Sequence, residues 1–231
     1  MNGFAMQLLK SAICIFQQMK KALKRVIQLG EDPQRVFNYG STSIDNIVNL
    51  ATLSKDEVLE SIGLNECKYF VCTYHPVTME AGDVDSLLEE FFFAIQKFPE
   101  YIFIITKSNA DQGGARINQL LDEAAQRIAN LYVYDSLGVK RYLSLMKYSE
   151  AVVGNSSSGI IETPAFHIPT VNIGDRQKGR LRTNSIIDCG TDRTSIIKAI
   201  DKAVSHEFRE QCKGIHPPYG DGHAAEKIAK K

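Results

Sequence analysis

Short apolar runs alternate with longer segments of helical periodicity along most of this 231-residue chain. The runs YFVCTY at 69–74 and YIFIIT at 101–106 are almost continuously apolar, which is typical of strands buried on both faces of a sheet. Further strands are predicted at 35–40, 131–134, 151–154, 169–173 and 185–189. Helices are predicted at 54–63, 84–98, 114–129, 138–148, 159–166, 193–206 and 222–230. This alternation indicates βαβ units, and hence an α/β domain with a doubly wound parallel sheet.

In three of the predicted helices, or just before them, a residue indicates where the helix starts or how long it can be. Ser54 followed by Glu57 has the spacing of a capping box. Asp221, in the turn YGDGH, is placed to cap the final helix. Pro164 lacks a backbone donor and cannot lie deep in a regular helix, so the helix at 159–166 must be short or kinked.

Residues 4–29 have the pattern of one amphipathic helix that Gly30 ends. The apolar positions at helical spacing are Leu9, Ile13, Phe16, Leu23 and Ile27. Because lysines occupy much of the rest, this helix could lie on a membrane surface. Packing on its own domain is the more ordinary role and the one we expect, although it could also mediate a dimer. The predicted organisation is therefore a helix at 1–29 and one domain at 30–231.

Composition and charge argue against several classes of protein. Lys and Arg together number 27, as do Asp and Glu, so the basic surplus typical of a nucleic-acid-binding protein is missing. We expect neither a membrane span nor a signal peptide, because the apolar runs are short and the start has no basic segment followed by a cleavage site. The five cysteines are odd in number and form no CxxC pair. They predict reduced thiols and a cytoplasmic protein.

Three unusual loops follow predicted strands. His75 in HPVT follows the strand at 69–74, GNSSSG follows the strand at 151–154, and GDRQKGR follows the strand at 169–173. In an open parallel sheet, ligands bind beyond the carboxyl ends of the strands. We therefore expect the three loops to face one cleft.

The serine-rich loop places small residues and hydroxyl groups at the start of a helix. Small residues let backbone amides approach a ligand, and the N–H groups at a helix start favour an anion such as phosphate. Glu162 lies four residues after Ser158 and therefore on the same helix face, where a carboxylate would repel phosphate but would suit the hydroxyls of a ribose. The same pattern is compatible with an ordinary helix cap. From the residues alone, both interpretations stay open.

His75 and the basic loop also allow two interpretations. His75 can be a general acid or base, or a donor to phosphate, because imidazole titrates near neutral pH. A histidine before a proline is also an ordinary surface residue. Arg176, Lys178, Arg180 and Arg182 can clamp a diphosphate or a partner domain, or they can form a solvated charged loop.

Together, the segments TYHPVTME, GNSSSGIIETPAFHIPTVNIGDRQKGR and PYGDGHAAEKI resemble the C-terminal half of the UDP-N-acetylglucosamine 2-epimerases. The passage RVIQLGEDPQRVFNYGSTSIDNI resembles the segment that enters that half, so the likeness covers residues 25–231. The His-Pro pair and the GDRQKGR loop are similar to the hydrolysing branch. The non-hydrolysing bacterial enzymes typically have His-Arg-Arg-Glu at the first position.

The resemblance implies a glycosyltransferase-B-type fold, of which this chain would be the Rossmann-like, UDP-binding C-terminal domain. It implies conversion of UDP-N-acetylglucosamine to N-acetylmannosamine and UDP for sialic-acid-type sugar synthesis, through a glycal and without metal or cofactor. His75 would aid the departure of UDP. The implied binding residues are Ser157, Ser158 and Gly159 for the diphosphate, Glu162 for the ribose, and Arg176 and Arg180 for the closing side of the cleft.

The catalytic carboxylates of the family lie in an N-terminal domain that these residues do not match. We therefore expect a truncated, UDP-binding half with little or no turnover alone, either as a homodimer or completed by another chain. Three alternatives remain: a binding module that holds UDP or a UDP-sugar without chemistry, the nucleotide domain of a glycosyltransferase that uses UDP-N-acetylglucosamine, and a structural domain whose serine loop is only a cap.

Overall fold

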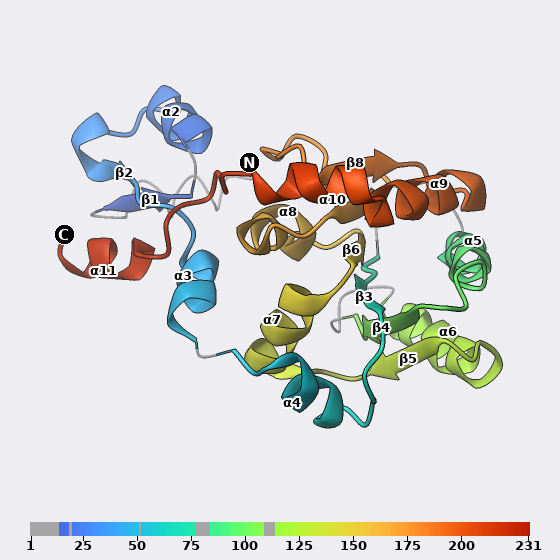
Figure 1. Cartoon of the computed structure of the whole chain (residues 1–231). Helices are drawn as coiled ribbons and strands as arrows, with labels where there is room; N and C mark the ends of the chain where they lie inside the picture. The colour runs from blue at the N-terminus through green and yellow to red at the C-terminus, as the bar shows by residue number, and fades with distance from the viewer. Residues whose placement is uncertain (1–13, 19, 51, 77–83, 109–113) are drawn as a thin grey trace. The chain divides into compact units, whose positions relative to one another are not determined.

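The computed structural model describes residues 14–18, 20–50, 52–76, 84–108 and 114–231 (Figure 1). The chain divides into two compact units. Unit 1 comprises Met1–Leu50 and Pro217–Lys231, and unit 2 comprises Ala51–His216. All of the predicted site residues belong to unit 2.

Unit 2 is built on six parallel strands in the order β5-β4-β3-β6-β7-β8. The strands are β3 (Tyr69–Thr73), β4 (Ile102–Thr106), β5 (Leu131–Tyr134), β6 (Ala151–Gly154), β7 (Thr170–Ile173) and β8 (Ile186–Cys189). The strand order reverses between neighbours β3 and β6, where Cys72 pairs with Val153. The predicted doubly wound parallel sheet is confirmed, and its crevice is expected at this reversal.

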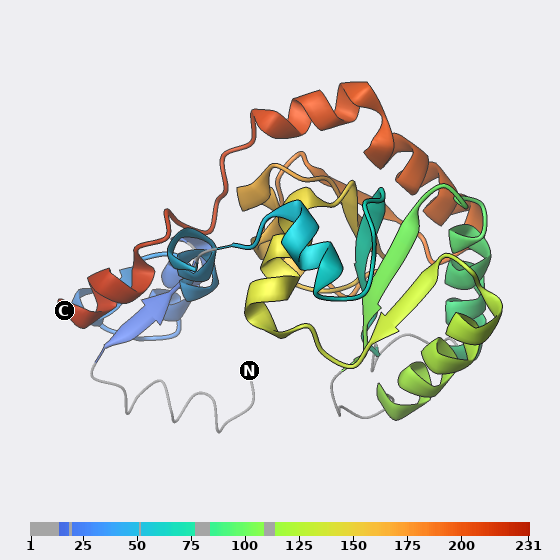
Figure 2. The ribbon, with the colours of Figure 1, turned by 60° about the horizontal axis from the view of Figure 1, so that its bottom comes forward.

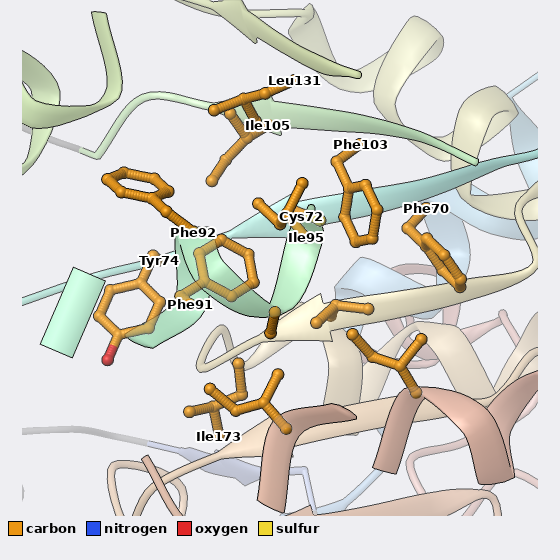
Figure 3. Packing of buried hydrophobic residues seen from close by; sticks show 14 of the residues in the cluster. Phe70, Cys72, Tyr74, Phe91, Phe92, Ile95, Phe103, Ile105, Leu131 and Ile173 are labelled. Carbon is orange, nitrogen blue, oxygen red and sulfur yellow. The ribbon is translucent and has the colours of Figure 1, made fainter. Parts of the chain in front are cut away.

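Helices pack on both faces of the sheet, because successive side chains of a strand point to opposite faces. Phe70 and Cys72 belong to one buried cluster and Tyr69 and Val71 to another. The helices of the first cluster are α5 (Val84–Ile95), α6 (Gly114–Arg127) and α9 (Arg193–Val204), and those of the second are α4 (Lys55–Glu60) and α7 (Gly138–Tyr148) (Figure 2). The aromatic side chains of the first cluster pack closely in Figure 3. Each fully buried Phe contributes roughly 1.5–3 kcal/mol of transfer free energy.

Helix ends in unit 2 follow the local sequence. The capping box of Ser54 and Glu57 is present at the start of α4, as predicted. The segment at 159–166 is short and kinked, also as predicted: α8 (Ser158–Ile161) gives way to the 3-10 helix η2 (Thr163–Phe166), which has Pro164 in its first turn. A further helix, α10 (His206–Lys213), was not predicted. It begins because Ser205 leaves the helical conformation and its hydroxyl accepts a hydrogen bond from the amide of Phe208.

Unit 1 contains a small parallel sheet. Strand β1 (Ile15–Gln17) pairs with β2 (Val36–Asn38), which follows the 3-10 helix η1 (Pro33–Arg35). Helix α2 (Lys20–Gln28) packs on this sheet, and α3 (Thr42–Asn49) contacts the C-terminal helix α11 (Ala224–Ala229) (Figure 1). Among the described residues, one buried cluster here consists of Ile15, Val26 and Val36.

The predicted single helix at 4–29 is wrong where the structure describes it. Residues 15–17 form a strand because Ile15 and Phe16 pair with Val36 and Phe37 of β2, and this pairing overrides the helical spacing. The helix is confined to 20–28, and residues 4–13 lie outside the described part of the chain. The compact units also divide at residue 50 and again at 217, rather than at 30, because the C-terminal helix packs on α3.

The cap of the final helix comes from a residue far away in the sequence. The carboxylate of Asp45 on α3 accepts hydrogen bonds from the amides of Ala224 and Ala225, at 2.9 and 2.6 Å. Asp221 instead accepts from the amide of His223 and forms an ion pair with Lys227. The predicted capping role of Asp221 is therefore wrong for the first turn of α11.

The five cysteines are unpaired, and burial raises the pKa of Cys189 to about 12 and that of Cys212 to about 11. Within the described ranges, none of the helices has the length and apolar character to cross a membrane.

Candidate functional site

The three predicted loops meet where the strand order reverses. His75 lies two residues beyond β3, the serine loop follows β6, and the basic loop follows β7, which is the neighbour of β6. Asn155, at the start of the serine loop, is hydrogen-bonded both to His75 and to side chains of the basic loop. The three loops therefore come together, but the expectation that all three face one cleft is wrong for the basic loop, whose residues border a separate cavity.

A cavity of about 450 Å³ opens at this edge of the sheet. Four of the residues that line it belong to the predicted loops: His75, Ser156, Ser158 and Glu162. The rest come from the ends of β3, β4 and β5 and the start of α7: Thr73, Thr106, Lys107, Ser108, Asp135, Ser136, Leu137, Gly138, Val139 and Tyr142. Ser157, Gly159, Arg176 and Arg180 do not line this cavity.

Two glycines let the serine loop lie close to the sheet. Gly154 has a φ of 140°, and a Cβ there would lie 2.1 Å from the carbonyl oxygen of Thr73. Only glycine permits this approach, so the loop leaves β6 directly beside the end of β3. A Cβ on Gly159 would lie 2.7 Å from Cγ2 of Thr170, so this buried glycine has a packing role on β7.

The serine loop is ordered by its own hydroxyl groups. The Ser156 hydroxyl accepts a hydrogen bond from the amide of Ser158 at 3.3 Å, which leaves the Ser156 hydroxyl proton available to an acceptor in the cavity. The Ser158 hydroxyl donates to the Glu162 carboxylate, which confirms that these two side chains share one face. The second oxygen of that carboxylate remains able to accept from a ligand.

His75 is held through its backbone and its ring. Its Nδ1 lies 3.3 Å from the hydroxyl of Ser108, whose own amide and carbonyl are bound by Asn118. Its peptide N–H and C=O are both bound by the Asn155 side chain, at 2.7 and 2.9 Å. His75 is thus an anchored residue at the cavity wall.

The polar residues after β4 and β5 were missed by the sequence analysis. The ammonium of Lys107 lies between the carboxylates of Asp135, at 2.7 Å, and Asp122, at 2.9 Å, and these contacts raise its pKa. Tyr142 projects from α7 to within 3.4 Å of the Thr73 hydroxyl, and burial raises its pKa. Both groups stay protonated at neutral pH, so the cavity has here one ammonium that is already paired with two carboxylates, and one neutral hydroxyl. The position of Lys107 directly after the predicted strand at 101–106 was the available signal, whereas Tyr142 lies inside a helix and had no such signal.

The basic loop supports the serine loop rather than lining the cavity. Arg176 Nη1 and Gln177 Nε2 donate to the carbonyl oxygen of Asn155, at 3.1 and 2.8 Å. Arg180 is exposed, and Lys178 and Arg182 border a separate cavity of about 790 Å³. Arg182 forms an ion pair with Asp188 of β8, and Lys178 with Asp175. Among the described residues, no group of three or more His, Cys, Asp or Glu side chains could hold a metal ion.

The all-parallel sheet, its reversal and the cavity beside it define a doubly wound α/β domain of the glycosyltransferase-B type. The model of the family UDP-N-acetylglucosamine 2-epimerase matches residues 8–231. The chain therefore belongs to the UDP-N-acetylglucosamine 2-epimerase family.

Individual relatives agree with this assignment. The chain is 39% identical over 189 residues to the hydrolysing GDP/UDP-N,N'-diacetylbacillosamine 2-epimerase of Campylobacter jejuni, covering 81% of this chain and 49% of that protein. It is 37% identical to the polysialic acid biosynthesis protein P7 of Escherichia coli, covering 85% and 50%. The fold is similar to that of MnaA from S. aureus, solved with UDP, at a TM-score of 0.74, 18% identity and coverage of 96% and 60%. The chain spans about half the length of the curated relatives it matches.

Proposed function

We propose that unit 2 binds the UDP moiety of a UDP-N-acetylhexosamine, and that the chain is the UDP-binding half of a hydrolysing 2-epimerase. The observation that carries the proposal is the pair Ser158–Glu162 in the cavity beside His75, at the reversal of the sheet. A fixed carboxylate beside hydroxyl and amide donors suits a ligand that has vicinal hydroxyls next to phosphates. Membership of the family supports this assignment.

In this proposal each predicted residue has a role at a stated group. Glu162 accepts hydrogen bonds from the ribose hydroxyls, and the loop at 156–159 donates to the diphosphate. His75 donates to a phosphate oxygen next to the bond that breaks. Arg176 and Arg180, which lie outside the lining of the cavity, would supply positive charge from the closing side of the cleft.

The reaction proposed for the complete enzyme has two steps. Loss of the C2 proton and cleavage of the C1–O bond release UDP and leave a glycal. Water then adds across the double bond, with its hydroxyl on C1 and a proton on the opposite face of C2, which gives the 2-epimer. The residues of this chain stabilise the charge that develops on the departing diphosphate. The C2 base belongs to the family's other half, so we expect little or no turnover from these residues alone.

Two sugars are candidates for the group attached to UDP. The identity of 37% with protein P7, named for polysialic acid biosynthesis, favours N-acetylglucosamine, whose 2-epimer is N-acetylmannosamine. The identity of 39% with the C. jejuni enzyme favours N,N'-diacetylbacillosamine. Competition of the two UDP-sugars against UDP for binding to the chain ranks them.

Calorimetric titration of the chain with UDP tests the proposal. We expect saturable binding that Glu162→Gln weakens by about 10-fold or more, because hydrogen bonds to a charged group contribute about 1.5–3 kcal/mol. Glu60→Gln on the exposed face of α4 is the matched control and should bind like the wild type. Absence of UDP binding by the wild type would show that the serine loop is only a helix cap. Accumulation of N-acetylmannosamine from UDP-N-acetylglucosamine would refute the expected lack of turnover.

A further inference from the structure

Asn155 connects all three loops of the candidate site, yet it does not line the cavity. Its side chain, 1% exposed, binds the backbone of His75 at two points, the N–H and the C=O. The Oδ1 atom accepts from the His75 amide at 2.7 Å, and Nδ2 donates to the His75 carbonyl at 2.9 Å. The orientation of the His75 backbone is therefore set by one planar amide.

The main chain of the same residue fixes the other two loops. Its amide donates to the carbonyl of Thr73 at 3.2 Å, which ties the serine loop to the end of β3. Its carbonyl accepts from Arg176 Nη1 and Gln177 Nε2 of the basic loop. Only glycine can adopt the backbone conformation of Gly154 so close to Thr73. The end of the sheet therefore fixes the position of Asn155.

The chemistry at His75 requires an amide side chain. A primary amide offers one acceptor and two donor hydrogens, which match the N–H and the C=O of the His75 backbone. A carboxylate of the same shape keeps the bond from the His75 amide but places a second acceptor against the His75 carbonyl. A buried pair of acceptors without a proton is unfavourable, so the Asn155→Asp change releases half of the contact while preserving volume.

We propose that Asn155 is a positioning residue, whose side chain holds His75 in the orientation that acts on the diphosphate. This inference rests on the proposed function. The nucleoside part of the ligand is bound by Glu162, whose side chain is held by the Ser158 hydroxyl and not by the Asn155 side chain. Loss of Asn155 therefore weakens the contribution of the diphosphate and spares that of the nucleoside.

The test compares UDP and uridine as ligands of the full chain by NMR titration. Asn155→Asp and Asn155→Ala should each weaken UDP binding by about 10-fold or more, while uridine binding changes by less than about twofold. Asn130→Ala is the matched control, because Asn130 similarly binds the carbonyls of Ile95, Phe98 and Tyr101, but before β5 at the amino ends of the strands. This control should lower stability and leave the ratio of UDP to uridine affinity unchanged.

Each outcome has a distinct meaning. If the wild type does not bind UDP, the proposed function fails. If the wild type binds but the Asn155 variants bind UDP normally, or lose UDP and uridine affinity equally, the positioning role is overturned. If the variants do not fold, hydrogen exchange of the wild type still tests the inference. UDP, but not uridine, should slow hydrogen exchange at the His75 amide and the Asn155 side-chain amide, and equal exchange with both ligands would overturn the inference.

Discussion

Unit 2 and unit 1 are both built on parallel strands, but they differ in how completely those strands are covered. In unit 2, six strands have buried clusters on both faces, and Phe70, Phe91 and Phe103 are fully buried. Among the described residues of unit 1, two strands share a buried cluster of three residues with α2, and Ile44, Tyr219 and Ala224 are buried elsewhere. Parallel sheets are normally covered on both faces, and two strands alone are marginal. Unit 2 therefore has the makeup of a self-sufficient domain, and unit 1 depends on a few specific contacts.

The two units also differ in that only one of them contains described residues of the candidate site. The described residues of the candidate site all belong to unit 2, at strand ends or on the helices that follow them. Unit 1 exposes three of its large apolar side chains by more than a third, namely Leu29 at 43%, Val48 at 54% and Leu50 at 38%. A polar contact also holds unit 1 together, because the Asp45 carboxylate accepts two hydrogen bonds from the start of α11. Substitutions in the two units should therefore differ in how much they lower the free energy of unfolding and in how much of the chain they affect.

The largest effect is expected at Gly154 in unit 2. A methyl group there would lie 2.1 Å from the Thr73 carbonyl oxygen, and the φ of 140° is unfavourable for any side chain. Gly154→Ala must separate β3 from β6, so we expect a loss of more than about 3 kcal/mol in the free energy of unfolding, or failure to fold. Urea unfolding measures it. Gly63→Ala, where nothing lies within 4 Å, should cost only about 1–2 kcal/mol.

Equal costs for the Gly154 and Gly63 variants would mean that the sheet tolerates separation at its reversal. The contrast between a rigid unit 2 and a lightly held unit 1 would then lose its main support. A large cost confined to Gly154 would instead place the stability of the whole unit at the strands that carry the site.

A moderate and local effect is expected at Asp45 in unit 1. Asp45→Ala removes the acceptor for the amides of Ala224 and Ala225, which should cost about 1–2 kcal/mol in helix stability, as for other helix caps. Hydrogen exchange should accelerate at both amides and in α3, and remain unchanged in the strands of unit 2. Asp221→Ala, at the residue that the sequence favoured as the cap, is the control and should have a smaller effect. If the Asp45 variant loosened unit 2 as well, the two units would have to be regarded as one cooperative structure.

The helix cap that Asp45 provides, in place of Asp221, also shows what the sequence could and could not predict about the fold. The buried strands were predicted because β3 and β4 are continuous apolar runs, and this pattern depends only on local residues. Strand β1 is too short, at three residues, to interrupt the helical spacing around it. Helix α3 has a β-branched and polar sequence, TSIDNIVN, and was not predicted. The cap on α11 comes from a residue 179 positions away, so no local pattern could reveal it.

The candidate site divides in the same way. His75 and Ser158 were predicted together because each lies just after a strand, and the parallel sheet brings strand ends to one edge. Glu162 was predicted because it lies four residues after Ser158 on the same helix face. Lys107 and Tyr142 belong to no motif, although Lys107 directly follows a predicted strand. The role of Asn155 depends on hydrogen bonds to loops 80 and 22 positions away. Only a folded structure brings those partners together.

The smallest effect concerns pH and a surface contact of unit 2. Glu90 of α5 accepts hydrogen bonds from the Arg193 guanidinium and from the Arg193 amide at the start of α9, and these lower the pKa of Glu90 from 4.5 to about 2. The native carboxyl thus binds fewer protons than the unfolded one at intermediate pH. Its stabilisation is fully present above pH 4.5 and is lost as the pH falls toward 2. Glu90→Gln should therefore flatten the fall of unfolding free energy across that window.

Urea unfolding between pH 6 and pH 2.5 measures this slope, with Glu207→Gln on the exposed face of α10 as the control. The control should follow the wild-type curve, because Glu207 forms no ion pair among the described residues. Parallel curves for Glu90→Gln and the wild type would show that the contact between α5 and α9 does not respond to acid. A flattened curve, with faster hydrogen exchange in α9 than in β3 at low pH, would show that acid loosens the outer layer of unit 2 first. The sheet that holds the candidate site would then outlast the helices that cover it.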